Sequence, residues 1–176
     1  LGSLMLLSGP RLHPLWNTPL LPLLFLISCI TMGYAIVVFE SVLASRFFKR
    51  QPETSMLNRL SCVGVIPIWL YLGIRFVDLI ARGRLGLMFR PDGYALMFWI
   101  ETALLVWAAV LYYRSGKRMT LGGMFRGAML MALVGALYRF DTYLVAFNPG
   151  EQWSYFPTVP EILFTVGIIA IEIAIY

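Results

Sequence analysis

The chain has 176 residues, of which 60% are hydrophobic and 13% are charged, and its mean hydropathy is +0.78. A typical soluble domain is about 25% charged, so 14 Lys and Arg with 9 Asp and Glu are too few to cover a soluble surface. This excludes an ordinary soluble globular domain, a disordered chain and a secreted disulfide scaffold, and it predicts an all-α, polytopic membrane protein. The net charge of +5 comes from short basic clusters between apolar runs, a pattern that is typical of membrane loops and excludes a nucleic-acid partner.

Five apolar segments are long enough to cross about 30 Å of hydrocarbon as helices. We expect them at about residues 20–45, 57–80, 94–113, 121–147 and 158–176, within a single transmembrane domain that covers residues 1–176. Pro19 and Pro22 mark the start of the first segment, and Pro67 interrupts the second. In the fourth segment, glycines 123, 127 and 135 predict close approach of a neighbouring helix.

The basic residues of the short loops predict the orientation in the membrane. One side carries eight, namely Arg46, Lys49, Arg50, Arg59, Arg114, Lys117, Arg118 and Arg126. The other side carries four, namely Arg11, Arg82, Arg84 and Arg90. The first side is therefore predicted to be cytoplasmic, and the first, third and fifth segments run from outside to inside. The loop at 148–160, with Trp153, Tyr155 and Phe156, suits an aromatic belt at the outer interface.

Three glutamates lie in these outside-to-inside segments. An ionisable side chain inside a membrane costs free energy, so each glutamate indicates a function or a specific partner. At 1.5 Å per residue, Glu101 lies roughly 12 Å, Glu172 roughly 21 Å and Glu40 roughly 30 Å from the outer end of its segment. If the helices adjoin, the carboxyl groups form a staggered ladder that suits a proton relay, with Glu101 the strongest candidate. The alternative is that each carboxyl hydrogen-bonds a neighbouring helix, and Glu40 can also extend to the cytoplasmic interface.

A second group of polar residues is expected near the outer face, and it consists of Arg75, Asp78, Arg139, Asp141, Glu161 and His13. Arg75 and Asp78 are three residues apart and share a helical face. Arg139 and Asp141 are two apart, so each should have a partner elsewhere. The functional interpretation is a polar pocket that binds a quinone head group or admits protons, and the alternative is a set of ion pairs between helices.

The sequence shows no catalytic or metal-binding constellation. Cys29 and Cys62 lie inside apolar runs and form no CxxC motif, so we expect no iron–sulfur cluster or zinc site. His13 is the one histidine, whereas a b-type haem with two histidine ligands needs two. We therefore expect no haem in this chain.

Several stretches together resemble one known family over the whole chain. They are residues 2–5, 13–16, 38–40, 75–76, 82–83, 97–101, 144–150, 155–158, Glu161 and 170–172. The chain resembles the C-terminal half of the NrfD/PsrC-type integral membrane subunits, and most closely those of hydrogenase-2-type nickel–iron hydrogenases. It ends inside an apolar run, and we interpret it as a fragment of a longer membrane protein.

The resemblance implies a helical protein of the bacterial inner membrane, built around four-helix bundles. Family members anchor a periplasm-facing iron–sulfur subunit and catalytic hydrogenase subunits, and they exchange electrons with menaquinone or ubiquinone without binding haem. Their quinone site is associated mainly with the N-terminal bundle, and proton translocation has been proposed for several. The alternatives are a membrane subunit of a polysulfide or nitrite reductase, a secondary transporter, or a passive anchor.

Overall fold

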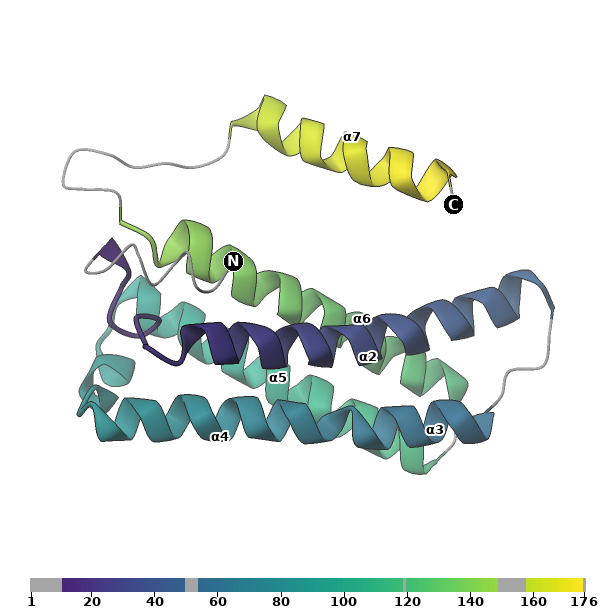
Figure 1. Cartoon of the computed structure of the whole chain (residues 1–176), viewed down its shortest axis with the longest axis horizontal. Coiled ribbons are helices and arrows are strands. Elements are labelled where there is room, and N and C mark those ends of the chain that lie inside the picture. The colour runs from purple at the N-terminus through teal and green to yellow at the C-terminus, as the bar shows by residue number, and fades with distance from the viewer. Residues whose placement is uncertain (1–10, 50–53, 119, 149–157, 176) are drawn as a thin grey trace.

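The computed structural model describes residues 11–49, 54–118, 120–148 and 158–175, and these residues fold into helices without a β-strand (Figure 1). The α-helices are α2 (Leu21–Phe47), α3 (Thr54–Val63), α4 (Val65–Ala81), α5 (Gly93–Lys117), α6 (Leu121–Phe140) and α7 (Val159–Ile175). A short 3₁₀ helix, η2 (Leu85–Phe89), precedes α5, and a π-helical turn, η3 (Asp141–Val145), follows α6. The predicted all-α fold class is confirmed.

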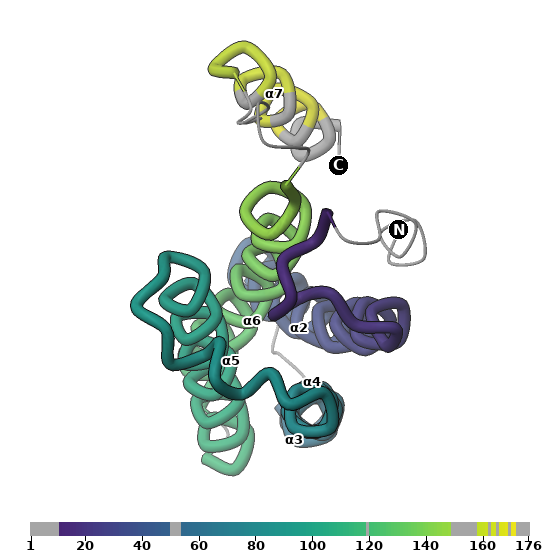
Figure 2. Tube along the Cα trace, turned by 90° about the vertical axis from the view of Figure 1, so that its left-hand side faces the viewer, coloured from purple at the N-terminus to yellow at the C-terminus, as the bar shows by residue number. Residues whose placement is uncertain are grey.

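Four of the helical segments form a bundle. Viewed along its length, α2, the α3–α4 pair, α5 and α6 form a ring in which α6 lies between α2 and α5 (Figure 2). The α3–α4 pair closes the ring on the other side, because α4 packs on α2 and α3 packs on α5. In this order α2 and α5 are diagonal to each other.

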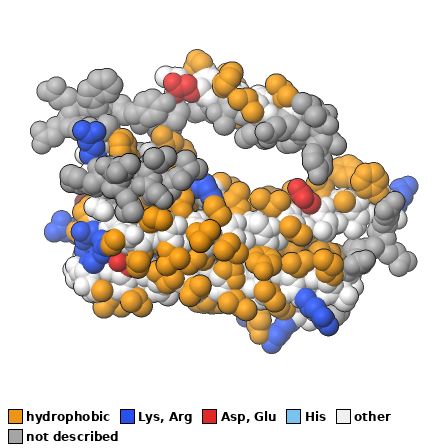
Figure 3. Space-filling model, viewed as in Figure 1, with side chains coloured by type: hydrophobic (Ala, Val, Ile, Leu, Met, Phe, Trp, Pro, Cys, Tyr) orange, Lys and Arg blue, Asp and Glu red, His pale blue; other side chains and the backbone are white. Residues whose placement is uncertain are grey.

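Four segments are long and apolar enough to cross a membrane: Leu21–Phe47, Thr54–Ala81, Gly93–Lys117 and Leu121–Val145. They overlap the first four predicted segments. The fifth predicted segment coincides with α7, which has 17 residues and lies apart from the bundle (Figure 1). Hydrophobic side chains cover most of the bundle face seen in Figure 3, and Lys and Arg gather mostly towards its two ends, as expected for a bundle surrounded by lipid.

The second membrane segment differs from the single helix predicted from the sequence, because it consists of α3 and α4 with a break at Gly64. Pro67 has no N–H with which to reach the carbonyl four residues before it. Gly64 also lies where two neighbouring helices come close: a Cβ there would be 3.1 Å from Tyr112 Cε1 and 3.3 Å from Tyr34 Cβ. The absent backbone bond and the crowded position together explain the break.

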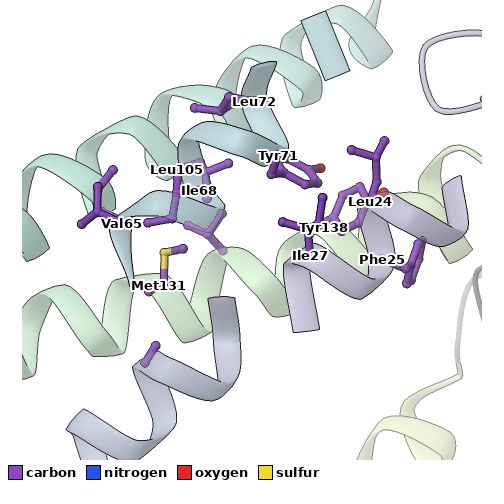
Figure 4. Packing of buried hydrophobic residues seen from close by; sticks show 14 of the residues in the cluster. Leu24, Phe25, Ile27, Val65, Ile68, Tyr71, Leu72, Leu105, Met131 and Tyr138 are labelled. Carbon is purple, nitrogen blue, oxygen red and sulfur yellow. The ribbon is translucent and has the colours of Figure 1, made fainter. Parts of the chain in front are cut away.

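Glycines on α6 let its neighbours approach closely, as their spacing predicted. A Cβ at Gly127 would lie 3.2 Å from Tyr112 Cα of α5, and one at Gly135 would lie 3.0 Å from Met32 Sδ of α2. Between the helices lies a continuous core of buried side chains (Figure 4). This core also contains the polar residues that form the candidate site.

Candidate functional site

The bundle core contains a buried ion pair between α4 and α5. Arg75 of α4 is 4% exposed and Glu101 of α5 is 1% exposed. Arg75 Nη1 donates to Glu101 Oε1 at 2.5 Å, and Nη2 donates to Oε2 at 3.1 Å. This two-point contact matches the planar guanidinium to the planar carboxylate and fixes both side chains.

Aromatic side chains surround this pair. Tyr71 lies one helical turn before Arg75; its hydroxyl accepts a hydrogen bond from Arg75 Nη1 at 2.9 Å and donates to Glu101 Oε1 at 3.3 Å. The guanidinium carbon lies 4.4 Å from the ring centroid of Phe98 and 5.6 Å from that of Tyr138, which are cation–π distances. Tyr71 and Tyr138 lie next to each other in the core (Figure 4), with ring centroids 5.4 Å apart. The cluster of Arg75, Glu101, Tyr71, Phe98 and Tyr138 is called the core cluster below.

Two small cavities flank the core cluster. One, of about 20 Å³, is lined by Glu101, Tyr71 and Tyr138 together with Ser28 and Thr31 of α2. The other, of about 10 Å³, is lined by Arg75, Tyr138, Asp78, Trp16 and Thr18. A water molecule needs about 10–15 Å³ and several polar partners, so each cavity has about the volume of one water, beside polar groups of the core cluster and otherwise mostly apolar side chains. Tyr138 lines both.

The carboxylate of Asp141 has no direct partner among the described residues. It is fully buried at the first position of the π-helical turn η3. Neither of its carboxylate oxygens has a hydrogen-bond partner among the described residues. It lies close enough to Glu101 and Arg75 for both charges to act on it. Because a buried, unpaired carboxylate is costly, Asp141 is a candidate for proton binding.

The expected outer-face group is not one cluster. Arg75 pairs with Glu101 in the core rather than with Asp78, because α4 directs it toward α5. Asp78 instead forms an ion pair with Arg82, four residues further along the chain, with Oδ1 3.0 Å from Nε. Arg139 faces α2, where Nη2 donates to Cys29 Sγ at 2.9 Å. The sequence spacing could not assign the partners of these residues.

His13 and Glu161 lie outside the core cluster. The His13 ring stacks on Tyr94 with centroids 4.3 Å apart, and its backbone N–H donates to the Ala146 carbonyl at 2.8 Å. Burial lowers the pKa of the His13 imidazole, and the Asp92 carboxylate opposes this shift. Glu161 accepts the Thr158 N–H at 3.0 Å at the start of α7, where an acidic side chain favours the helix N-terminus.

Of the three glutamates in the predicted ladder, the structure describes the side chains of two, and it does not bring Glu40 and Glu101 together. α2 and α5 are diagonal in the bundle, so their side chains meet only where both point into its core. Accordingly Glu101 is buried in the core, whereas Glu40 is exposed on α2. Glu172 belongs to α7, but its side chain lies outside the part of the chain that the structure describes, as do Trp153, Tyr155 and Phe156.

The aromatic residues of the core cluster were not identified as site residues from the sequence. A signal was available for Tyr71, because a tyrosine four residues before an intramembrane arginine lies on the same helical face. Phe98 likewise lies three residues before Glu101 on α5. Tyr138 had no such signal, because it comes from α6 and meets Arg75 only through the ring order of the helices.

The fold and the core cluster define a polytopic helical membrane protein with a buried ion pair in the centre of its bundle. Comparison with known families agrees: the sequence model described as "Polysulphide reductase, NrfD" matches residues 5–141. The chain belongs to the NrfD family.

Two relatives match the whole chain. The "Probable Ni/Fe-hydrogenase 2 b-type cytochrome subunit" of Escherichia coli (strain K12) is 36% identical over 179 residues, and the match covers 100% of this chain and 46% of the relative. A protein of Nitratidesulfovibrio vulgaris, named only "Protein", is 29% identical over 187 residues, with 100% of this chain and 47% of the relative covered. The chain thus spans about half the length of the curated relatives it matches. No solved structure matches it significantly.

The first relative corrects one expectation. Its name describes a b-type cytochrome, which is a haem protein, and this overturns the expectation of no haem. That expectation counted histidines in this chain, but the chain covers 46% of the relative, so haem ligands can come from the remainder. Since the chain contains one histidine, a haem with two histidine ligands would take at least one of them from outside it.

Proposed function

We propose that this chain is part of the quinone-linked integral membrane subunit of a respiratory nickel–iron hydrogenase complex. In this role the subunit anchors the periplasm-facing iron–sulfur and catalytic hydrogenase subunits, and it passes electrons to menaquinone or ubiquinone. The match of the whole chain to about half of a hydrogenase 2 subunit supports this assignment. We further propose that the core cluster carries protons, with Glu101 as the central transfer group.

The observation that carries the proton proposal is the buried Arg75–Glu101 pair between two water-sized cavities. A pair that served only to join helices would need no hydrated approach, whereas a relay needs polar groups or water on both sides. The cavity beside Asp78 and Thr18 provides the outer approach. The cavity beside Ser28 and Thr31 provides the inner one.

The geometry suggests how a proton would move through the cluster. At rest, Arg75 donates two hydrogen bonds to the Glu101 carboxylate. A proton that reaches Glu101 neutralises the carboxylate and weakens its hold on the guanidinium. Arg75 then turns towards the unpartnered carboxylate of Asp141. Loss of the proton into the other cavity restores the original pair, so Arg75 alternates between two carboxylates and Tyr138 separates the two approaches.

The test uses the complete complex in proteoliposomes. With Glu101→Gln, quinone-linked hydrogen oxidation should no longer move protons, while dye-linked hydrogen oxidation by the catalytic subunits continues. Since this variant leaves Arg75 without its carboxylate, Asp141→Asn is tested alongside it, because it removes the second acceptor and keeps the ion pair. Unchanged proton movement in both variants would show that the cluster is structural only.

The matched control is Glu40→Gln. It makes the same chemical change on an exposed membrane-helix glutamate, and proton movement should remain at the wild-type level. Loss of proton movement with Glu40→Gln, but not with Glu101→Gln, would show that protons pass along the surface of α2 rather than through the core cluster.

The alternative is the membrane subunit of another respiratory reductase, and the description of the matching family favours it because that description names polysulphide reductase. The two are distinguished by the proteins that purify with the subunit. A hydrogenase supports the main proposal, a molybdenum-type or other reductase supports the alternative, and recovery of the subunit alone from gently solubilised membranes would favour a transporter.

A further inference from the structure

A groove opens on the exterior of the helix bundle, between the α3–α4 pair and α5. Its volume is about 500 Å³, within the roughly 300–1,000 Å³ of typical small-molecule sites. Its lining is apolar apart from one cysteine, one tyrosine hydroxyl and one cation, and consists of Cys62, Val65, Ile66, Trp69, Ala109, Val110, Tyr113 and Arg114. The groove spans the break at Gly64, so that α3 and α4 both form its wall opposite α5.

The walls of the groove face the hydrocarbon of the membrane. Trp69 is 53% exposed and Ile66 is 65% exposed, although both lie inside a membrane-spanning segment. Such surfaces are covered by lipid chains in a bilayer. Unlike a flat helix face, this one is concave and has aromatic side chains at its rim, so it can hold one chain in a fixed position.

The charged end of the groove distinguishes it from an ordinary lipid-facing surface. Arg114 lies in the last turn of α5, followed one turn later by Lys117. Neither residue takes part in the ion pairs found in the described part of the chain. The predicted cytoplasmic side carries eight Lys and Arg but only Glu40 and Glu53. An apolar groove that ends at an unneutralised arginine matches a molecule with an apolar chain and an anionic head.

We propose that this groove binds an anionic phospholipid of the cytoplasmic leaflet. One acyl chain lies along Trp69 and Val110, and the lipid phosphate contacts Arg114, with Lys117 adding to the local positive potential. Basic pockets at the cytoplasmic ends of membrane helices recognise anionic head groups in this way. The proposal is independent of the proton route, because the groove shares no residue with the core cluster.

The test measures lipid retained by the purified, detergent-solubilised complex in native mass spectrometry, with phosphatidylglycerol or cardiolipin compared against phosphatidylethanolamine. The wild type should retain the anionic lipids preferentially. Arg114→Gln should weaken this binding about fivefold, the effect of about one basic residue near the membrane surface. Val110→Trp should also weaken it, because Val110 is exposed in the groove and the larger side chain fills it.

Arg126→Gln is the matched control, since Arg126 is a cation of the same predicted side that lies outside the groove lining. It should leave anionic lipid binding unchanged, and dye-linked hydrogen oxidation should be unaffected in every variant. Equal losses with Arg114→Gln and Arg126→Gln would overturn the proposal in favour of general surface charge. A photo-crosslinking residue at Ile66 should yield a lipid adduct, whereas an adduct to another protein segment or to a quinone would also overturn it.

Discussion

Arg75 and Glu101 show what a charged residue needs in the interior of a membrane protein. Each is almost fully buried, and each has a high desolvation cost. The two hydrogen bonds between them, the Tyr71 hydroxyl and the ring of Phe98 together replace the water that both groups lose. Such a pair is sensitive to the loss of one member, because the other then remains as an uncompensated buried charge.

The pair therefore predicts a non-additive stability effect. Arg75→Met should lower the free energy of unfolding by about 3–5 kcal/mol, because Glu101 is left alone in the core. Arg75→Met combined with Glu101→Met should recover most of this loss. Thermal unfolding of the purified complex, followed by tryptophan fluorescence, measures both.

Asp78→Asn serves as the control for this prediction. It breaks the more accessible Asp78–Arg82 pair on one helix and should cost no more than about 1 kcal/mol. If the double variant were as unstable as Arg75→Met alone, the loss would come from packing rather than from the unpaired charge.

The individual helices are positioned by their smallest residues. Gly123, Gly127 and Gly135 bring α6 close to both of its neighbours in the ring. This close approach carries Tyr138 of α6 into contact with Arg75 of α4, across the bundle. The helix-to-helix distances therefore control the geometry of the core cluster.

Two adjacent glycines give a matched test of this packing. A Cβ at Gly123 would lie 2.7 Å from Thr120 Oγ1 and 2.8 Å from Ser115 Cβ, whereas a Cβ at Gly122 would have nothing within 4 Å. Gly123→Ala should thus lower the melting temperature of the complex, because α5 and α6 must move apart. Gly122→Ala should keep or raise it, since alanine favours a helix by up to about 1 kcal/mol over glycine. Equal effects of the two substitutions would contradict the close α5–α6 contact.

At the scale of the whole molecule, four membrane segments in a ring and the distribution of charge predict one orientation. The α5–α6 connection should face the cytoplasm, and the α4–α5 connection with η2 should face the outside. Thr120 and Phe89 are exposed residues of these two connections, and replacing them leaves the charge balance unchanged.

In a variant whose Cys29 and Cys62 are replaced by serine, Phe89→Cys should react with a membrane-impermeant maleimide in spheroplasts. Thr120→Cys should react only after the membrane is opened. The reverse pattern would contradict the orientation, and labelling of both in spheroplasts would show that the intervening segment does not cross the membrane.

Much of this protein follows from its sequence alone. The low share of charged residues determined the class, the lengths of the apolar runs located α2, α4, α5 and α6, and burial deep in a run singled out Glu101. These are local properties: hydropathy and helix length depend on the residues of one segment, because lipid requires each segment to satisfy its own backbone hydrogen bonds.

The partners of the charged residues were decided by the tertiary structure. The sequence suggested Asp78 as the neighbour of Arg75 and a ladder from Glu40 through Glu101, but the ring order placed α4 beside α5 and left α2 diagonal to it. The same order brought Tyr138 to a guanidinium 63 positions before it in the chain. Which faces of separate helices meet depends on close packing over the whole bundle, and the scarcity of charge that identified a membrane protein carries no information about that choice.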